Sequence, residues 1–266
     1  MSGVRASVVT RSWVAALGAA FLFVVVPLAT ADQRALLAKI DSDDFGLPAP
    51  ESLGEPLRLW ATWYHIPVVD AARDGFRLPG VGGKPISPPI SGREWCQAAL
   101  QGVMTIREQD GLRRTYTYEG TGKRTEVDCQ SYHRHASAWA RAAGRSRFGV
   151  SKGPFGDGAG NYQLVPYRSV AVGTHLIPLG TVLFIPAARS VAITLPSGRK
   201  VLHDGYFFAS DRGGDIHQDH IDVFVGDSSE NPFPSFVLST SHDTFEAYIV
   251  DDGLVKPRLR HLHSLD

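Results

Sequence analysis

The chain has 266 residues, and its 27 basic residues balance 27 acidic ones, so the formal net charge is zero at pH 7. A chain of this length can bury one sizeable core, and we expect one domain that carries a smaller insertion. The zero net charge disfavours nucleic acid and anionic membranes as partners, because no overall field attracts either of them.

The N-terminus predicts a cleavable secretory signal over residues 1–31. Two arginines precede an apolar run from Trp13 to Leu28, and Ala29-Thr30-Ala31 offers the small residues that a signal peptidase accepts. A membrane anchor is the alternative, but the run is shorter than the roughly 20 residues of a spanning helix and contains Pro27. The mature protein is therefore expected in the periplasm or outside the cell, with no stable membrane insertion after signal cleavage.

Two terminal segments are expected to flank the domain. Residues 32–56 begin with a short helical stretch over 33–40 and end in a proline-rich run, which is typical of a tether. The domain itself is expected over 57–255. Residues 256–266 are mildly basic and predict a solvated tail.

The domain is predicted to open with a strand over 57–66. This stretch is rich in β-branched and aromatic residues and stops at Pro67. Alternation along a strand places Trp60, Thr62 and Tyr64 on one face, so these three side chains can line a groove together.

Residues 70–150 predict a small α+β insertion. Its first part, over 70–89, contains many glycines and prolines and is expected to be an irregular loop. Ser91 and Glu94 match a capping box, which predicts the start of a helix that ends at Gln101.

The rest of the insertion predicts strands over 103–107 and 114–119 and a helix over 131–143. Cys96 and Cys129 both lie in the insertion. An even pair in an oxidising compartment more often forms a structural disulfide than a reactive site, although two buried thiols remain the alternative.

Beyond residue 149, short strand-like stretches separated by turns predict a small β-barrel. Helices and strands do not alternate there, which disfavours a doubly wound parallel sheet. The expected strands cover 163–166, 169–172, 181–185, 191–195, 201–210, 221–225, 236–239 and 244–250.

The most informative stretch runs from Ala209 to Gly226. A predicted strand delivers Asp211 to a turn at Gly213 and Gly214, where the missing Cβ atoms permit positive φ and a close approach by backbone or ligand. The next strand carries Asp222, which alternation places on the face opposite to its apolar neighbours.

Two carboxyl groups on neighbouring strands suit the cleavage of a glycosidic bond, because one of them must stay protonated near neutral pH to donate to the leaving oxygen. Partial burial or a nearby like charge raises the pKa of such a group. On composition alone a structural alternative stays open, in which Asp211 caps the turn and Asp222 is a solvated strand residue.

Three motifs, in this order along the chain, carry a resemblance to a known family. They are Ala61-Thr-Trp-Tyr64-His-Ile-Pro67, Val170-Ala-Val-Gly-Thr-His-Leu-Ile-Pro-Leu-Gly180-Thr and Asp211-x-Gly-Gly-x-Ile-x-x-x-x-Ile-Asp222. Together they resemble the 3D (Asp-Asp-Asp) domain, a double-psi β-barrel family that includes membrane-bound lytic murein transglycosylases. The resemblance implies a mainly β fold, a six-stranded double-psi β-barrel with the α+β insertion between the first and second motifs.

The resemblance also implies roles at the level of residues. Asp222 takes the position of the acid/base and Asp211 that of the supporting carboxylate. Asp222 would protonate the oxygen between N-acetylmuramic acid and N-acetylglucosamine, then accept the muramic 6-hydroxyl proton and so close a 1,6-anhydro ring without water. The expected sugar contacts are Thr62, Tyr64, Gly213 and Gly214.

The chain departs from the family pattern at several positions. Gly173 stands where the family has its first aspartate, and His217 replaces a basic residue that commonly follows the diglycine. Asp215 and Asp219 add negative charge, which could raise the pKa of Asp222 or change the choice of glycan.

Several histidines suggest a metal-binding site, but their spacing does not support one. His133 and His135 lie two residues apart on a predicted helix and point in different directions. The closely spaced run Asp215, His217, Asp219 and His220 fixes no coordination geometry by its spacing alone. We therefore expect no metal and no cofactor.

The leading interpretation is a monomeric lytic murein transglycosylase that acts on peptidoglycan glycan strands. One alternative is an inverting glycoside hydrolase, in which Asp211 and Asp222 activate a water molecule. The other is a non-catalytic barrel that only binds the cell wall.

Overall fold

The computed structural model describes residues 31–109, 111–132 and 142–266. Residues 1–30 of the predicted signal lie outside this range, as do His133, His135 and most of the helix predicted over 131–143. Within the described ranges, no helix has the length and apolar character needed to cross a membrane.

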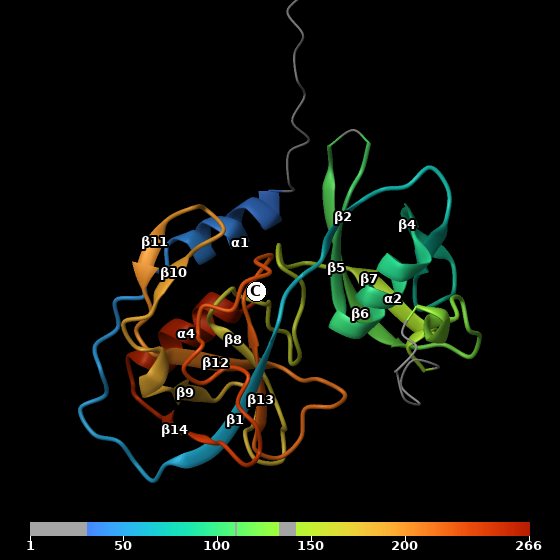
Figure 1. Ribbon diagram of the computed structural model, residues 1–266. Helices are drawn as coiled ribbons and strands as arrows, with labels where there is room; N and C mark the ends of the chain where they lie inside the picture. Colours follow the sequence, from blue (N-terminus) through green and yellow to red (C-terminus); the bar gives the residue numbers. More distant parts are fainter. Residues whose placement is uncertain (1–30, 110, 133–141) are drawn as a thin grey trace, which may run out of the picture.

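Six strands close into a barrel in the order β1-β13-β8-β12-β9-β14, shown at the lower left of Figure 1. The closed six-stranded barrel expected from the sequence is confirmed, whereas its double-psi connectivity stays a prediction. The barrel strands are β1 (Leu57–Tyr64), β8 (Ser169–Val172), β9 (Val182–Phe184), β12 (Tyr206–Asp211), β13 (His220–Phe224) and β14 (Phe245–Val250).

Alternation decides which side chains fill the barrel. Ile221 and Val223 of β13 pair with Val172 and Val170 of β8, and all four are buried in one hydrophobic cluster. Residues that pair across a ladder point to the same face of the sheet, so these side chains form the interior. Asp222, between the two buried residues of β13, consequently points out of the barrel.

The insertion forms a unit of its own beside the barrel, at the right of Figure 1. Its four-stranded sheet has the order β2-β5-β6-β7 and packs on the helix α2 (Gly92–Gln101), for which Ser91 and Glu94 form the predicted capping box. Cys96 and Cys129 are joined by a disulfide with their Cα atoms 5.5 Å apart, so the alternative of two thiols does not hold. The sheet strands are β2 (Val68–Asp70), β5 (Val103–Arg107), β6 (Arg113–Thr121) and β7 (Ser146–Val150).

The irregular loop predicted over 70–89 is wrong in part. Strand β3 (Phe76–Pro79) pairs antiparallel with β4 (Pro85–Ile90) in a two-stranded ribbon. Proline lacks an N–H donor and is tolerated in strands that have a free edge, and both strands of such a ribbon have one. The proline content therefore hid a hairpin.

Three further strand predictions were also inaccurate. The predicted strand 201–210 divides into β11 (Lys200–Leu202) and β12, because the chain turns at Gly205 with a φ of 94°. Strand β11 pairs with β10 (Ala192–Thr194) in a small hairpin. The stretches 163–166 and 236–239 make only isolated bridges. Two short 3-10 turns cover Cys129–Ser131 and Pro186–Ala188.

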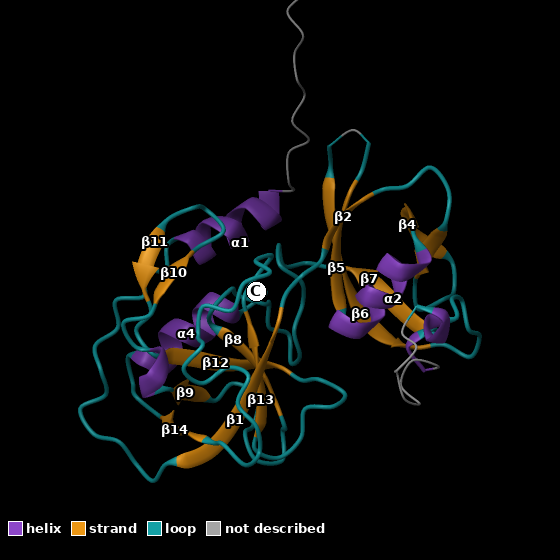
Figure 2. Ribbon diagram, viewed as in Figure 1, coloured by secondary structure: helices purple, strands orange, loops and turns teal. Residues whose placement is uncertain are grey.

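The solvated tail predicted over 256–266 is wrong. Helix α4 (Val255–His263) runs along the outer face of the barrel, as the purple helix beside β12 in Figure 2 shows. Its Val255, Leu259 and Leu262 are buried, at the i, i+4, i+7 spacing of an amphipathic helix. Basic residues between these positions gave the segment its hydrophilic composition.

The N-terminal segment predicted as a tether begins with the helix α1 (Ala31–Asp41) and is then fixed to the barrel. The buried guanidinium group of Arg168 donates through Nε to Asp43 Oδ2 at 2.6 Å and also pairs with Asp204. The ring of Phe45 lies 3.8 Å from this guanidinium group. A buried charge is tolerated only when it is paired, so this segment is part of the folded domain.

Candidate active site

Strand β8 brings the two candidate carboxyl groups together. It lies between β12 and β13, and its Ala171 is the register partner of Asp211 on one side and of Asp222 on the other. Register partners share a face of the sheet, so both carboxyl groups point out of the barrel across one small side chain. With strands spaced about 4.8 Å apart, the two Cα atoms lie about 10 Å from each other.

Strand β1 supplies a hydroxyl group to each carboxyl group. Tyr64 Oη donates to Asp211 Oδ2 at 2.8 Å, and Thr62 Oγ1 donates to Asp222 Oδ1 at 2.7 Å. The parallel pairing of β1 with β13 places Thr62 opposite Asp222 and turns the Trp60, Thr62 and Tyr64 face toward the site. The structure thus brings the four candidate side chains Thr62, Tyr64, Asp211 and Asp222 into one constellation.

Burial makes both carboxyl groups weaker acids than an ordinary aspartate. The pKa of Asp222 rises to about 6, first because of desolvation and then because of the nearby charge of Asp211, while the Thr62 hydrogen bond opposes the rise. The pKa of Asp211 also rises to about 6 through desolvation, opposed by the backbone N–H of Arg212 and by Tyr64. Burial beside the two carboxyl groups raises the pKa of Tyr64 well above its ordinary value, so it acts as a hydrogen-bond donor.

The diglycine turn allows a close approach but not through positive φ. Neither Gly213 nor Gly214 has a positive φ, so that part of the prediction was wrong. A Cβ atom on Gly213 would lie 2.5 Å from Ile216 Cγ1, whereas nothing stands within 4 Å of the same position on Gly214. Gly213 is needed for packing, and Gly214 leaves open space beside Asp211.

Tyr64, Asp211 and Asp222 line a cleft of about 970 Å³ between the barrel and the insertion, whereas Thr62 stands behind Asp222 and is not among the lining residues. The barrel contributes Asp211, Asp222 and both glycines, and the insertion contributes residues of α2 and β6 that include Leu100 and Tyr118. This volume is within the range of ligand sites. Of the described residues that line it, one is basic, Arg212, and the acidic ones are Glu119, Asp157, Asp211, Asp215 and Asp222.

His220 belongs to the site although sequence reasoning treated it only as a metal candidate. Its Nε2 lies 2.9 Å from Thr62 Oγ1, and its ring stacks on Trp60 with centroids 3.6 Å apart and planes 5° from parallel. The parallel register pairs Trp60 with His220, which explains the stack. Alternation could have placed His220 on the strand face of Asp222, but not beside Thr62 or Trp60.

The acidic and histidine run before β13 does not converge on a metal position. Among the described residues, no three histidine, cysteine, aspartate or glutamate side chains come together to hold an ion. His217 is exposed, and Asp219 Oδ1 accepts from Trp60 Nε1 at 3.3 Å. The contacts found for this run are therefore hydrogen bonds and ring stacking.

The neighbouring backbone explains why a glycine stands at position 173. A Cβ atom there would lie 2.7 Å from the backbone nitrogen of Gln218, so the loop after the diglycine turn occupies the space that a side chain would need. An aspartate at this position would require that loop to move. The backbone of Gln218 therefore leaves no room for a side chain at position 173.

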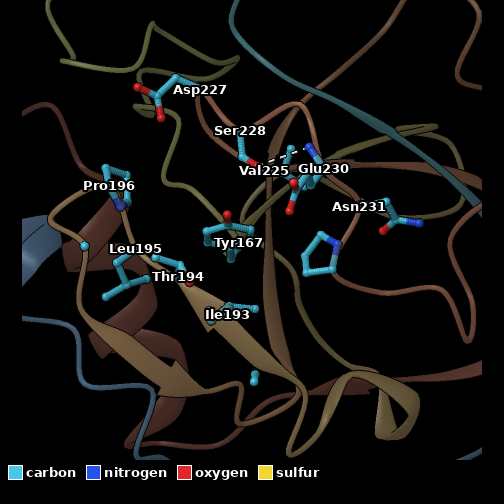
Figure 3. A pocket seen from close by; sticks show the side chains of 13 residues that line it. Tyr167, Ile193, Thr194, Leu195, Pro196, Val225, Asp227, Ser228, Glu230 and Asn231 are labelled. Atoms are coloured by element: carbon cyan, nitrogen blue, oxygen red, sulfur yellow. Dashed lines mark hydrogen bonds between the residues drawn. The ribbon is translucent and has the colours of Figure 1, made fainter.

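A second hollow of about 500 Å³ lies on another side of the barrel, beside β10. Figure 3 shows its lining, in which Ser228 accepts a hydrogen bond from the backbone nitrogen of Glu230 at 3.2 Å. Its Asp227 is exposed and lies 3.7 Å from Arg113 of the insertion. None of the predicted site residues contributes to this hollow.

Comparison with known proteins gives one family match, the 3D domain, over residues 168–231. No curated protein matches the chain. Among solved structures, E. coli MltA with bound chitohexaose is 20% identical at a TM-score of 0.44, over 72% of this chain and 71% of that one. A membrane-bound lytic murein transglycosylase from Agrobacterium tumefaciens is 15% identical at 0.49, over 89% and 88%. The lytic transglycosylase LtgG of Burkholderia pseudomallei is 19% identical at 0.36, over 71% and 70%.

The matched segment contains β8, β9, β12 and β13, but not β1, β14 or the insertion. It therefore includes both carboxyl groups and the diglycine turn, while Thr62 and Tyr64 reach the site from outside it. The 3D domain that the sequence motifs predict is confirmed as the part of this chain that carries Asp211 and Asp222.

Proposed function

We propose that the protein is a lytic-transglycosylase-like enzyme that cleaves the β-1,4 bond between N-acetylmuramic acid and N-acetylglucosamine in peptidoglycan. One observation supports this proposal above the others: Asp211 and Asp222 flank Ala171 on one face of the barrel and line one cleft, each with a pKa raised to about 6. A carboxyl group in that range can hold a proton and still release it near neutral pH.

Asp222 acts as the acid and then as the base. In the first half it donates its proton to the glycosidic oxygen as the bond to the muramic C1 breaks. In the second half its carboxylate accepts the proton of the muramic 6-hydroxyl group while O6 bonds to C1, so the product is a 1,6-anhydro sugar and Asp222 is protonated again. No water is consumed.

Asp211 supports this chemistry as the neighbouring carboxyl group of Asp222. It accepts hydrogen bonds from Tyr64 and from the backbone of Arg212, which favour its charged form and oppose the effect of its desolvation. The two groups, each with a pKa raised to about 6, titrate as a coupled unit. A carboxylate at Asp211 also stabilises positive charge that develops at the sugar C1.

The choice of peptidoglycan rests on the three sequence motifs and on the 3D domain over residues 168–231. Thr62, Tyr64, Gly213 and Gly214 contact the sugars beside the scissile bond, and the insertion covers them from the other side. The acidic lining opposes anionic polymers such as nucleic acid. The enzyme works as a monomer in the periplasm or outside the cell, after removal of the N-terminal signal.

The mass of the product tests this proposal. Purified sacculi are incubated with the protein, and the released muropeptides are analysed by mass spectrometry. A 1,6-anhydro product, one water lighter than the reducing sugar, is expected. Reducing ends with inverted configuration would instead indicate the hydrolase, which uses the Asp211 and Asp222 pair to activate water. Binding to sacculi with no released product would indicate a wall-binding barrel.

A further inference from the structure

The hydroxyl group of Thr62 stands between two groups that both need its hydrogen. Its Oγ1 lies 2.7 Å from Asp222 Oδ1 and 2.9 Å from His220 Nε2. A threonine hydroxyl carries one hydrogen, so it can donate to only one of these neighbours at a time. The other neighbour must then donate to the hydroxyl oxygen or lose its hydrogen bond.

Two arrangements satisfy all three groups. When Asp222 is protonated, it donates to Thr62, and Thr62 donates to a bare His220 Nε2. When Asp222 is ionised, Thr62 donates to the carboxylate, and His220 must carry a hydrogen on Nε2. The proton of Asp222 and the hydrogen of His220 are therefore linked through one hydroxyl group.

The surroundings of His220 favour the first arrangement. The ring is buried under Trp60 of β1, and burial is the main cause that lowers its pKa, so it is neutral near pH 7. Asp215 and Asp219 oppose this lowering and His217 adds to it. The ring also hydrogen-bonds to the backbone of Asp215, which can hold a hydrogen on the nitrogen away from Thr62.

We propose that His220 is a positioning residue that acts through Thr62 to keep Asp222 protonated before the glycosidic bond breaks. Before the reaction, His220 Nε2 takes the Thr62 hydrogen, and Thr62 thus accepts from protonated Asp222. After Asp222 has given its proton to the leaving oxygen, the Thr62 hydroxyl turns toward the new carboxylate, and the bare His220 Nε2 loses its hydrogen bond to Thr62 until Asp222 is protonated again. The muramic 6-hydroxyl proton then returns to Asp222, and the hydroxyl turns back, so no proton leaves the group.

This inference rests on the proposed role of Asp222, but a carboxyl titration tests it without any substrate. The pKa of Asp222 is measured by carbon NMR in the wild type, Thr62→Val and His220→Phe. His220→Phe keeps a flat ring on Trp60 but frees the Thr62 hydrogen for Asp222, so the pKa should fall. The fall should be about half a unit to one unit, the effect of one hydrogen bond. Because His220 acts through the Thr62 hydroxyl group, His220→Phe should leave the pKa unchanged when position 62 already carries valine.

Thr62→Ser and His242→Phe are the controls. Thr62→Ser keeps the hydroxyl group and should restore the wild-type pKa, and His242 is exposed and forms no part of the cleft. No fall in His220→Phe, or an equal fall when position 62 already carries valine, would overturn the proposal. If the wild type releases no anhydro product but His220→Phe lowers the pKa only when Thr62 is present, the proposed function fails while the hydrogen-bond link stands.

Discussion

Asp222 lies in an environment that disfavours its charged form, and this lowers the free energy of unfolding of the whole protein when the group ionises. Its carboxyl group is partly buried, accepts a hydrogen bond from Thr62 and faces the charge of Asp211. A group tuned in this way favours its protonated form in the folded state. The same environment that makes Asp222 a useful acid therefore destabilises the fold once the carboxyl group ionises.

Asp222→Asn is expected to stabilise the protein above pH 6 and to have little effect at pH 4. The folded pKa lies above the ordinary value, so the wild type loses stability as the pH rises from about 4 to about 6, and the loss is complete above that range. The full effect is at most about 3 kcal/mol. Urea unfolding at pH 4 and pH 7.5 measures it. A variant less stable than the wild type at pH 7.5 would contradict this account of the burial.

At the level of single residues, the sequence predicted which side chains share a strand face better than it predicted which of them are in contact. Alternation put Thr62 and Tyr64 on one face of their strand and Asp222 on the outward face of its own, and the family resemblance paired Asp222 with Asp211. The hydrogen bond between Thr62 and His220 depends on the parallel register of β1 and β13, two strands that are separated by more than 150 residues. Nothing in the local sequence fixes that register.

The disulfide is the element that holds the insertion together. It joins Cys96 in α2 to Cys129, which lie 33 residues apart, inside a unit whose small core is formed by one helix, the four-stranded sheet and the ribbon of β3 and β4. By loop-closure entropy a link of this length contributes about 4 kcal/mol. The insertion forms one wall of the cleft, so its stability bears directly on glycan binding.

Replacing both cysteines by alanine is expected to melt the insertion at a lower temperature than the barrel. The core of the barrel is separate from that of the insertion and includes neither cysteine. Calorimetry should show an early transition in the variant, and hydrogen exchange should assign it to β5, β6 and β7. A single unfolding transition unchanged from the wild type would show that the link adds nothing.

Helix α4 is expected to contribute strongly to barrel stability. Leu259→Ala removes a buried side chain from the outer face of the barrel and should cost about 2–5 kcal/mol in the free energy of unfolding. Leu254→Ala, at a position that is 83% exposed, is the matched control and should change it by less than about 0.5 kcal/mol. Equal effects of the two substitutions in guanidinium unfolding would refute the packing of α4.

Elements with a strong local pattern were predicted well, and those that depend on distant partners were not. The capping box located α2, and the period-two pattern located β8 and β13. Helix α4 escaped because its three buried positions are recognisable only once the outer face of the barrel is there to cover them. The hairpin of β3 and β4 escaped because proline usually indicates the absence of a strand.

At the scale of the molecule, the cleft lies between the barrel and the insertion, whose facing residues are distant from one another in the sequence. The sequence predicted a barrel and an insertion but not which residues of the insertion face the carboxyl groups. Leu100 and Tyr118 line the cleft because the chain leaves β1 and returns to β8 on the same side of the barrel. Such an arrangement is a property of the tertiary fold.

The central claim is that the Asp222 carboxyl group, at the wall of this cleft, cleaves glycan. The most direct measurement is the rate at which soluble muropeptides leave purified sacculi, compared among the wild type, Asp222→Asn and Asp243→Asn. Asp243 is an exposed aspartate outside the cleft. We expect Asp222→Asn to lose at least about a hundredfold in rate, the usual worth of a general acid, and Asp243→Asn to match the wild type. Equal release by the wild type and Asp222→Asn would contradict the account.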